Sequence, residues 1–538
     1  MTCANRINFF SLHNRRIIFQ LVYRRDNREL SDQQSVRANQ YRPNETRRHR
    51  AVDKTSSQQP NHSGENVPVW RKVFCNRTLN LRSVKAIGYD MDYTLIHYHV
   101  EQWERRVFAH VRERLLSMGW PVEDTAFDPA AVMRGLIIDK TLGNLVKANR
   151  FGYIKSVNHG TKPLDFDTQR KTYARTVVSL DESRWIFLNT LFGLSEGHMY
   201  CQLVDKLDAG VELPGVQSYS DLYKKVKGAV DLTHMEGQLK AEIIANPDMY
   251  VDLDPELPMT LLDQKYAGKK LLLITNSGWK YSREMMEYAF DAFLPGDMTW
   301  QDLFDIIIVS ARKPAFFSGI QPVYEVVDNG LLQPIVGGIE TGKRYSGGHS
   351  SLVEQCLKLS GEQILYVGDH VYGDVNVSKN IRRWRTALVL RELEGELQSI
   401  HSFRARQKEL TRLMKEKTRL ESDLSRARLQ VQRRSKGYGN SDTPSRSKLD
   451  KTLQHIRSEL IAIDELISPL AKAASELDNR RWGLLMRTGN DKSHMARQVE
   501  RHADIYTSRV SNFLHATPFE YFRSPRGSMP HDAGDFTK

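Results

Sequence analysis

Two aspartates directly after a short apolar run are the first residues in this chain whose types and spacing could do chemistry. Asp90 and Asp92 follow the run Val84–Tyr89, which we interpret as a buried strand. Acids at positions i and i+2 point toward one face where a strand turns into a loop. Carboxylates this close together repel each other, so the pair requires a cation or a shared proton.

Two more aspartates follow another apolar run. Asp369 comes directly after Ile364–Val367 and Gly368, and Asp374 lies five residues further on. Because the carboxyl ends of parallel strands meet at one edge of a sheet, we expect these acids to share one crevice with the first pair. An all-oxygen cluster of this kind suits Mg²⁺, which keeps several waters and takes few protein carboxylates.

The other two strand ends carry groups that suit an anion. The run Lys270–Ile274 ends in Thr275-Asn276, and a hydroxyl with backbone N–H groups at a strand-to-helix turn forms an anion site. The run Phe304–Val309 is followed by Lys313, which places a cation at the same edge. Acids, metal, hydroxyl, backbone N–H and lysine are the parts that phosphoryl transfer requires, because its catalysis is mainly positioning and charge neutralisation.

Each of these motifs also has a purely structural interpretation. The Asp-x-Asp-x-Thr that starts at Asp90 could cap a helix or belong to a calcium loop. Thr275 could cap a helix, Lys313 could be a surface residue, and Gly-Asp-His at 368–370 could be a turn. Four such motifs in this order, each at a strand terminus, favour the catalytic interpretation over coincidence.

The elements that position these residues form a doubly wound α/β domain. The four runs and a fifth, Thr386–Leu390, lack polar alternation, as parallel strands covered on both faces do. The amphipathic stretches Tyr281–Phe293 and Ser351–Leu359 are the predicted crossover helices. The predicted fold class is therefore α/β, with a doubly wound, Rossmann-like parallel sheet, a large insertion after the first strand and a C-terminal helical hairpin.

The chain divides into five predicted segments. Its 538 residues suggest three or four domain-sized units at roughly 150 residues each. The interval between the first two strands must fold as its own unit, and an insertion there forms a cap over the carboxyl ends of the strands. We predict a disordered basic leader (1–70), a catalytic core (71–97 and 266–392), a cap or substrate domain (98–265), a helical hairpin (393–480) and a C-terminal helical segment that packs on the core (481–538).

Heptad spacing predicts the helical hairpin. Apolar residues recur every seven positions in two registers, with one polar interruption at Lys417, as in a coiled-coil seam: Leu413, Leu420 and Ala427, and Leu410, Leu424 and Val431. After a loop rich in Gly and Ser, apolar residues alternate by three and four: Leu453, Ile456, Leu460, Ile463 and Ile467. An antiparallel hairpin is the simplest interpretation, and its seam could close on itself or serve a second subunit.

The formal net charge of +13 is concentrated in two segments. Residues 1–70 hold twelve Lys/Arg and six Asp/Glu (+6), residues 404–434 hold eleven and four (+7), and the rest of the chain is neutral overall. This distribution favours a disordered arm and a solvated helix, so we do not expect a nucleic-acid partner. The alternative is electrostatic binding of RNA or DNA by residues 1–70 or the hairpin, which predicts a steep salt dependence. No apolar stretch reaches the ~18 residues of a membrane span, and four dispersed cysteines indicate neither a disulfide framework nor a zinc site.

These motifs resemble the haloacid dehalogenase (HAD) superfamily and, within it, the cytosolic purine 5′-nucleotidase family of the IMP/GMP-specific type. The similarity runs from about residue 70 to 532. It is carried by the segments Gly88–Leu95, Thr275–Ser277, Ala311–Pro314, Tyr345–Gly348 and Tyr366–His370, and by flanking text at Arg134–Leu136, Gly143–Leu145, Leu188–Phe192 and Met529–His531. The resemblance implies a HAD core, a cytoplasmic protein and a homo-oligomer, whereas the Arg-rich leader leaves import into an organelle open.

The same resemblance implies a two-step hydrolysis of nucleoside 5′-monophosphates. Asp90 would attack phosphorus and form an aspartyl-phosphate, and Asp92 would protonate the departing oxygen and then activate water. Mg²⁺ would be held by the Asp90 carboxylate, the Asp92 backbone carbonyl and Asp369, with Asp374 beside it. The phosphoryl group would be held by Thr275, the Asn276 backbone and Lys313.

The predicted cap departs from the family pattern. After Asn158-His159-Gly160 the chain has Thr161-Lys162 where the purine enzymes place an aromatic and an amide near the base, and the segment after Asp205 also differs. A purine preference is therefore not implied. The alternatives are a phosphatase for another small phosphoester and a scaffold that works through the helical hairpin. Retention of the acids and the lysine argues against the scaffold, since a dead site has no chemical reason to keep them.

Overall fold

The computed structural model describes residues 67–235, 237–327, 330–439 and 444–527. The predicted leader therefore lies largely outside the described residues, as does the motif Met529–His531. The leader's last residues are structured: Val69–Arg71 form a 3-10 turn, η1, and the Trp70 ring packs edge-on against His401 with 5.6 Å between ring centroids. Trp70, the last residue of the predicted leader, thus contacts the folded part of the chain.

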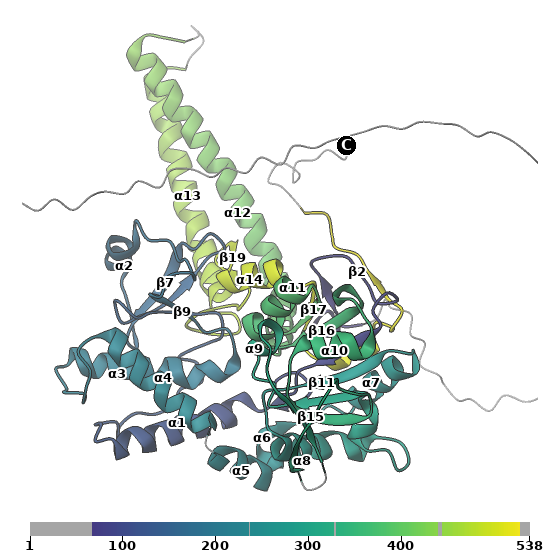
Figure 1. Ribbon diagram of the computed structural model, residues 1–538. Coiled ribbons are helices and arrows are strands. Elements are labelled where there is room, and N and C mark those ends of the chain that lie inside the picture. Colours follow the sequence, from purple (N-terminus) through teal and green to yellow (C-terminus); the bar gives the residue numbers. More distant parts are fainter. Residues whose placement is uncertain (1–66, 236, 328–329, 440–443, 528–538) are drawn as a thin grey trace, which may run out of the picture. The chain divides into compact units, whose positions relative to one another are not determined.

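Five apolar runs form five parallel strands at the centre of the main sheet (Figure 1). These are β3 (Ala86–Tyr89), β11 (Lys270–Ile274), β12 (Ile306–Val309), β16 (Ile364–Gly368) and β17 (Arg385–Val389). They lie in the order β17-β16-β3-β11-β12, and every neighbouring pair is parallel. The predicted doubly wound α/β class is confirmed. Because β3 has one later strand on each side, the strand order reverses there, which is where such sheets bind ligands.

The described residues extend this sheet to ten strands. Two further strands are parallel to their neighbours: β15 (Lys343–Gly347) beside β12 and β20 (Ile505–Thr507) beside β17. The edges are antiparallel and consist of β1 (Phe74–Cys75), β13 (Val323–Val326) and β14 (Leu332–Pro334). The sequence analysis misses these five strands because they are short and most of them carry polar or half-buried residues, which blurs the apolar pattern.

Both faces of the sheet are covered by apolar contacts, because successive residues of each strand point to opposite sides. Ile87, Leu273 and Val367 pack on the side of α7 (Leu257–Tyr266), α8 (Trp279–Phe290) and the 3-10 turn η8 (Val510–Leu514). Leu272, Ile308 and Tyr366 pack on the side of α9 (Ala315–Ser318) and α10 (Ser350–Leu357). The short helix α11 (Val377–Arg382) leads into β17.

The insertion after the first strand leaves and re-enters the core through two paired strands. β4 (His97–Tyr98) is antiparallel to β10 (Val251–Asp252). Between them lies a five-stranded antiparallel sheet, ordered β8-β7-β6-β5-β9. Its strands are β5 (Ile137–Asp139), β6 (Asn144–Ala148), β7 (Ile154–His159), β8 (Lys162–Pro163) and β9 (Trp185–Phe187). The helices are α1 (Val100–Ser117), α2 (Phe166–Tyr173), α3 (Leu194–Asp208), α4 (Tyr219–Met235), α5 (Gly237–Ala245) and α6 (Pro247–Tyr250).

The C-terminal segment is not purely helical, contrary to the prediction for 481–538. It contains α14 (His494–His502) and η8, but also β18 (Arg487–Thr488), β19 (Asp491–Lys492), β20 and β21 (Tyr521–Phe522). β21 pairs with β2 (Leu79–Asn80) near the start of the folded chain. Strands of two or three residues hold too few positions for a periodic signal, so only their pairing reveals them.

The same C-terminal segment ties the insertion to the core. The buried Lys147 ammonium of β6 donates to the carbonyls of Trp482 (2.5 Å) and Leu484 (2.6 Å). Burial lowers the pKa of Lys147 to about 8. Arg150 forms an ion pair with Asp491 at 3.0 Å. Because this segment also supplies β20 to the main sheet, these contacts connect the two sheets through one stretch of chain.

The hairpin consists of α12 (Leu393–Lys436) and α13 (Arg446–Ser475), which run side by side in Figure 1. Its seam closes within the chain: Leu410, Leu413 and Leu420 of α12 share one buried cluster with Ile456, Ile463 and Ile467 of α13. The polar interruption, Lys417, pairs with Asp464 across the seam at 2.6 Å. Among the described helices, α12 included, none is both long and apolar enough to span a membrane.

Candidate active site

The predicted site residues stand at the carboxyl ends of four neighbouring strands. Asp90 follows β3, Thr275 follows β11, and Asp369 follows β16. Lys313 lies four residues after β12, and Asp374 lies in the π-helical turn η7 (Val371–Asn376). Parallel pairing fixes the register, with Tyr89 of β3 opposite Leu273 and Val367, so the residues that follow these strands begin at one level.

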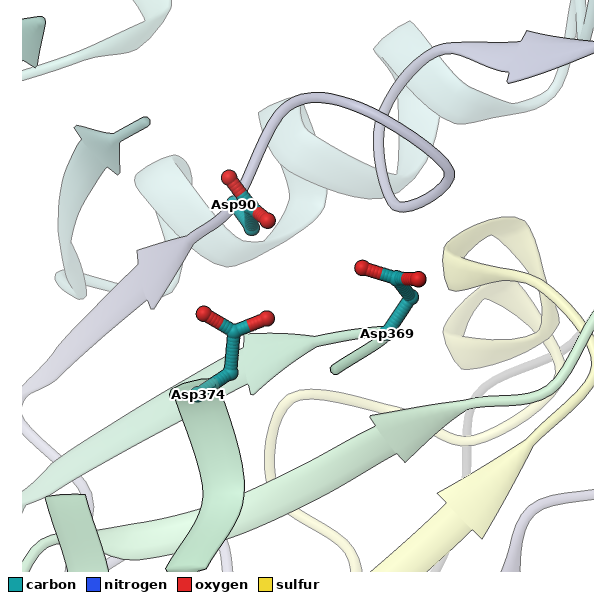
Figure 2. A group of neighbouring side chains, drawn as sticks. All are labelled: Asp90, Asp369 and Asp374. Atoms are coloured by element: carbon teal, nitrogen blue, oxygen red, sulfur yellow. The ribbon is translucent and has the colours of Figure 1, made fainter. Parts of the chain in front are cut away.

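Three carboxylates meet at this edge. Figure 2 shows the side chains of Asp90, Asp369 and Asp374 directed toward a common centre, and one oxygen of each lies within 4.8 Å of the others. All three side chains are buried. Gly368 makes room for this arrangement, since a Cβ at that position would lie 2.5 Å from Asp374 Oδ2. The geometry is that of an all-oxygen cation site.

Burial disfavours the ionised forms of Asp90 and Asp369. Desolvation raises the pKa of Asp90 well above its usual range against the opposing effect of Lys313, and it raises the pKa of Asp369 to about 7. The neighbouring carboxylates add to both shifts. A divalent cation would compensate the repulsion, so the donor set and its electrostatics both suit Mg²⁺.

Lys313 is the cation that the structure places against the acids. Its ammonium lies 2.7 Å from Asp90 Oδ1 and 2.8 Å from Asp374 Oδ1, and it donates to the Tyr366 hydroxyl at 3.0 Å. Burial lowers the pKa of Lys313, but Asp374 and Asp90 outweigh burial and hold the pKa well above its ordinary value. The lysine is therefore charged when both acids are ionised.

The loop after β11 holds Lys313 in place. Asn276 Oδ1 accepts from the Lys313 backbone N–H at 2.6 Å, and Asn276 Nδ2 donates to the Lys313 carbonyl at 3.1 Å. The buried Thr275 hydroxyl accepts from the Ser277 N–H at 3.0 Å, which leaves its own proton for another acceptor. The Asn276 side chain is therefore committed to the lysine loop, and the anion site is left to the Thr275 hydroxyl and the backbone.

Asp92 lies beside the acidic cluster and outside it. Its carboxylate accepts hydrogen bonds from the Tyr98 hydroxyl at 2.6 Å and from the Ser277 hydroxyl at 2.7 Å. The side chain is not one of the three grouped carboxylates, so of the predicted metal ligands only Asp90, Asp369 and Asp374 bring their side chains together. The expectation that Asp92 offers a metal its backbone carbonyl stays a prediction.

Several residues around the site escaped the sequence analysis. Tyr98 also hydrogen-bonds Tyr281 at 2.9 Å, and Lys240 of α5 donates to Ser277 at 3.2 Å while its ammonium lies 4.8 Å from the Tyr281 ring centroid. Their spacing along the chain carries no motif, and only Ser277 stood next to a predicted residue. The insertion thus contributes a cation to the edge of the site through Lys240.

Two residues brace Asp369 from the insertion. The buried Arg134 guanidinium donates to the Asp369 carbonyl, and the Thr190 hydroxyl lies 3.4 Å from Asp369 Oδ2. Both belong to segments that carry the family resemblance, Arg134–Leu136 and Leu188–Phe192. Their resemblance to the family pattern was the available signal, but it did not indicate which site residue they contact.

Comparisons with known proteins identify the family to which this chain is similar. Residues 73–534 match the 5′ nucleotidase family. A 5′-nucleotidase domain-containing protein from Dictyostelium discoideum is 27% identical over 474 residues, which cover 86% of this chain and 74% of that protein. Solved structures with a similar fold include a predicted phosphoglycolate phosphatase from Haemophilus somnus (14% identity, 57% of this chain, 85% of that chain, TM-score 0.25) and a HAD-superfamily hydrolase from Geobacter sulfurreducens (10%, 57%, 87%, 0.23). These TM-scores are too low to bear on the site.

Proposed function

Because the chain belongs to the 5′-nucleotidase family, we propose that it hydrolyses nucleoside 5′-monophosphates to nucleoside and phosphate through an aspartyl-phosphate, with Mg²⁺ as cofactor. At the coarser level the chain is a phosphoric monoester hydrolase, as the sequence analysis predicted. The observation that carries the proposal is the buried Lys313 ammonium between Asp90 and Asp374, at the strand ends where the family motifs stand.

Asp90 is the proposed nucleophile. Its Oδ1 accepts from the Met91 N–H at 2.7 Å and faces Lys313 at 2.7 Å, whereas Oδ2 has no hydrogen-bond donor among the described residues. One oxygen is thus oriented by two donors and the other is available to attack phosphorus. Attack forms the Asp90–phosphorus bond and breaks the bond from phosphorus to the sugar oxygen.

Asp92 is the proposed proton donor and acceptor. The hydroxyls of Tyr98 and Ser277 fix its carboxylate next to the nucleophile. In the first step it gives a proton to the departing oxygen. In the second step it takes a proton from the water that hydrolyses the aspartyl-phosphate, which regenerates both acids.

The phosphoryl group itself requires neutralisation, because a carboxylate attacks a dianionic phosphate only when the phosphate charge is offset. Lys313, the Thr275 hydroxyl and the Asn276 backbone N–H would supply donors for its oxygens. Mg²⁺ would be held by Asp90, the Asp92 carbonyl, Asp369 and Asp374, and when bound it supplies further charge neutralisation of the phosphoryl oxygens.

In this proposal, the insertion determines which leaving group the site accepts. Lys240 provides a positive charge near Asp92, the proposed acid for the leaving group, because both side chains contact the Ser277 hydroxyl. In the loop after β7, the Thr161 hydroxyl is already taken by Asp205 at 2.5 Å. No described feature of this loop supports a purine preference, so the alternative of another small phosphoester is kept as an outcome of the test.

The test is phosphate release from a panel of nucleoside 5′-monophosphates and other small phosphomonoesters, with Mg²⁺ and with EDTA. We expect hydrolysis of nucleotides that EDTA abolishes, and loss of at least 10³-fold with Asp90→Asn. Asp167→Asn, an exposed aspartate of α2, is the matched control and should behave like the wild type. Activity on another phosphoester alone would favour the alternative substrate class. Equal activity of Asp90→Asn and wild type would refute the mechanism.

A further inference from the structure

The positive charge of α12 is confined to one side of the helix. At about 100° per residue, seven Lys/Arg side chains fall within an arc of about 80°. These residues, which we call the arginine stripe, are Arg404, Lys408, Arg412, Lys415, Arg419, Arg426 and Arg433. Four of them recur every seven residues, from Arg412 to Arg433, which is the repeat of the hairpin seam. The stripe therefore runs parallel to the seam along the length of the helix.

The arginine stripe faces away from the rest of the hairpin. Its centre lies about 120° around the helix from the buried seam residues Leu413, Leu420 and Ala427. All seven side chains are exposed, with Arg412, Arg419 and Arg426 at 59%, 66% and 75%. The side of α12 that α13 does not cover thus presents a row of cations.

The ion pairs of the stripe are weak. Arg412 pairs with Glu409 and Glu416, and Arg419 and Arg426 both approach Asp423, at 2.7 to 3.6 Å. These acids lie about 20–60° outside the arc, on its seam side, and are themselves at least a third exposed. Exposed pairs within one helix contribute little, so a multivalent anion can displace them.

The composition of the arc favours a phosphate backbone over other anionic surfaces. Between residues 404 and 433, the only other residues within this arc are Ser422 and Gln430. The arc therefore contains neither an aromatic nor an aliphatic side chain. Without apolar residues the arc cannot insert into a lipid interface, and without aromatic residues it cannot stack on unpaired bases. Five of its seven cations are arginines, whose planar fork suits phosphate oxygens.

We propose that the arginine stripe binds the phosphate backbone of double-stranded RNA without reading its sequence. The stripe spans about 43 Å, from 29 residues at 1.5 Å each. This length is comparable to the roughly 16 base pairs over which double-stranded RNA is recognised by shape, through phosphates and 2′-hydroxyls. Ser422 and Gln430 can hydrogen-bond such hydroxyls. The proposal replaces our expectation from the distribution of charge that the chain has no nucleic-acid partner, and it does not depend on the proposed phosphatase function.

The test is fluorescence anisotropy of a labelled 24-base-pair RNA duplex titrated with the full chain at several salt concentrations. If about four stripe residues contact phosphates at once, log Kobs falls against log[salt] with a slope of about −3.6. The binding constant then falls roughly 150-fold between 50 and 200 mM salt. The triple variant Arg412→Gln, Arg419→Gln, Arg426→Gln should bind at least about 30-fold more weakly at 50 mM salt and show a slope nearer −1.

A control variant removes the same charge from other sides of α12: Arg406→Gln, Arg428→Gln and Lys436→Gln. It should bind within about threefold of the wild type. Glutamine preserves helix propensity, and unchanged circular dichroism and phosphatase activity verify folding of both variants. The basic leader is present in all three proteins and cannot explain a difference between them. Equal weakening of both variants, stronger binding of phosphatidylserine vesicles or polyglutamate than of RNA, or no binding at 50 mM salt would overturn the proposal.

Discussion

Replacing Lys313 by methionine removes a positive charge from the site while keeping most of the side-chain volume. The ammonium lies 2.7 Å from Asp90 Oδ1 and 2.8 Å from Asp374 Oδ1, and all three side chains are buried. Removing one partner of a buried ion pair costs about 3–5 kcal/mol of unfolding free energy, because the remaining charges lose their compensation. Losing one electrostatic contact to the transition state lowers the rate by a factor on the order of 10²–10³.

The stability loss should depend on pH in a defined direction. Burial already raises the pKa of Asp90 well above its usual range, and loss of the cation raises it further. The folded variant then keeps protons that the unfolded chain releases above about pH 4. The wild type shares this effect in part, so the deficit of the variant relative to the wild type opens above the pH at which Asp90 ionises in the folded wild type, and it grows as pH rises further.

Urea denaturation at pH 4.5 and pH 7.5 in EDTA measures this deficit, and phosphate release with Mg²⁺ measures the rate. Lys343→Met is the matched control, because Lys343 bridges Glu325 and Glu340 at 3.3 and 3.1 Å but is 41% exposed. That substitution should leave both the unfolding free energy and the rate close to the wild-type values, because exposed ion pairs contribute little. If Lys313→Met were as stable as Lys343→Met at pH 7.5, or kept more than a tenth of the activity, the electrostatic account of the site would be refuted.

Three further predictions concern the surroundings of the site and Glu104, a buried acid of α1. Tyr98→Phe removes a 2.6 Å hydrogen bond to the proposed proton donor and should lower kcat about tenfold with KM within twofold. Tyr281→Phe keeps the ring and removes a hydroxyl that contacts Tyr98 and not Asp92, so it should lower kcat less than threefold. Gly368→Ala places a Cβ 2.5 Å from Asp374 Oδ2. We therefore expect the variant to stay folded and its steady-state rate of phosphate release to fall by a factor on the order of 10². Full activity would contradict this close contact between Gly368 and Asp374. Burial raises the pKa of Glu104 from 4.5 to about 7, so its contribution to stability is full below pH 4.5 and falls by about 3 kcal/mol as pH rises to 7. Glu104→Gln should flatten that part of the stability profile, and an unchanged slope would exclude this carboxyl as its source.

The central strands and the acids that follow them could be predicted from local pattern. Parallel strands buried on both faces appear as continuous apolar runs, which is why β11 has its predicted bounds and the other four differ by two residues or fewer. A strand end is also a fixed position in such a sheet, so Asp90, Asp369 and Lys313 could be expected at one edge. The heptads of α12 likewise specify a helix with one buried side.

The partners of these residues depend on contacts between distant parts of the chain. Arg134 reaches Asp369 across 235 positions, and Tyr98 reaches Tyr281 across 183. No local period encodes such pairs, because they form only when the insertion and the core fold against each other. The same holds for β20, which forms a strand by pairing with β17. It also holds for the seam of α12, because heptads predict a buried side of the helix but do not identify the helix that covers it. Residue type and spacing thus specify which chemistry is available. Tertiary packing decides which side chains orient the catalytic groups, because the neighbours that orient them lie far away in the sequence.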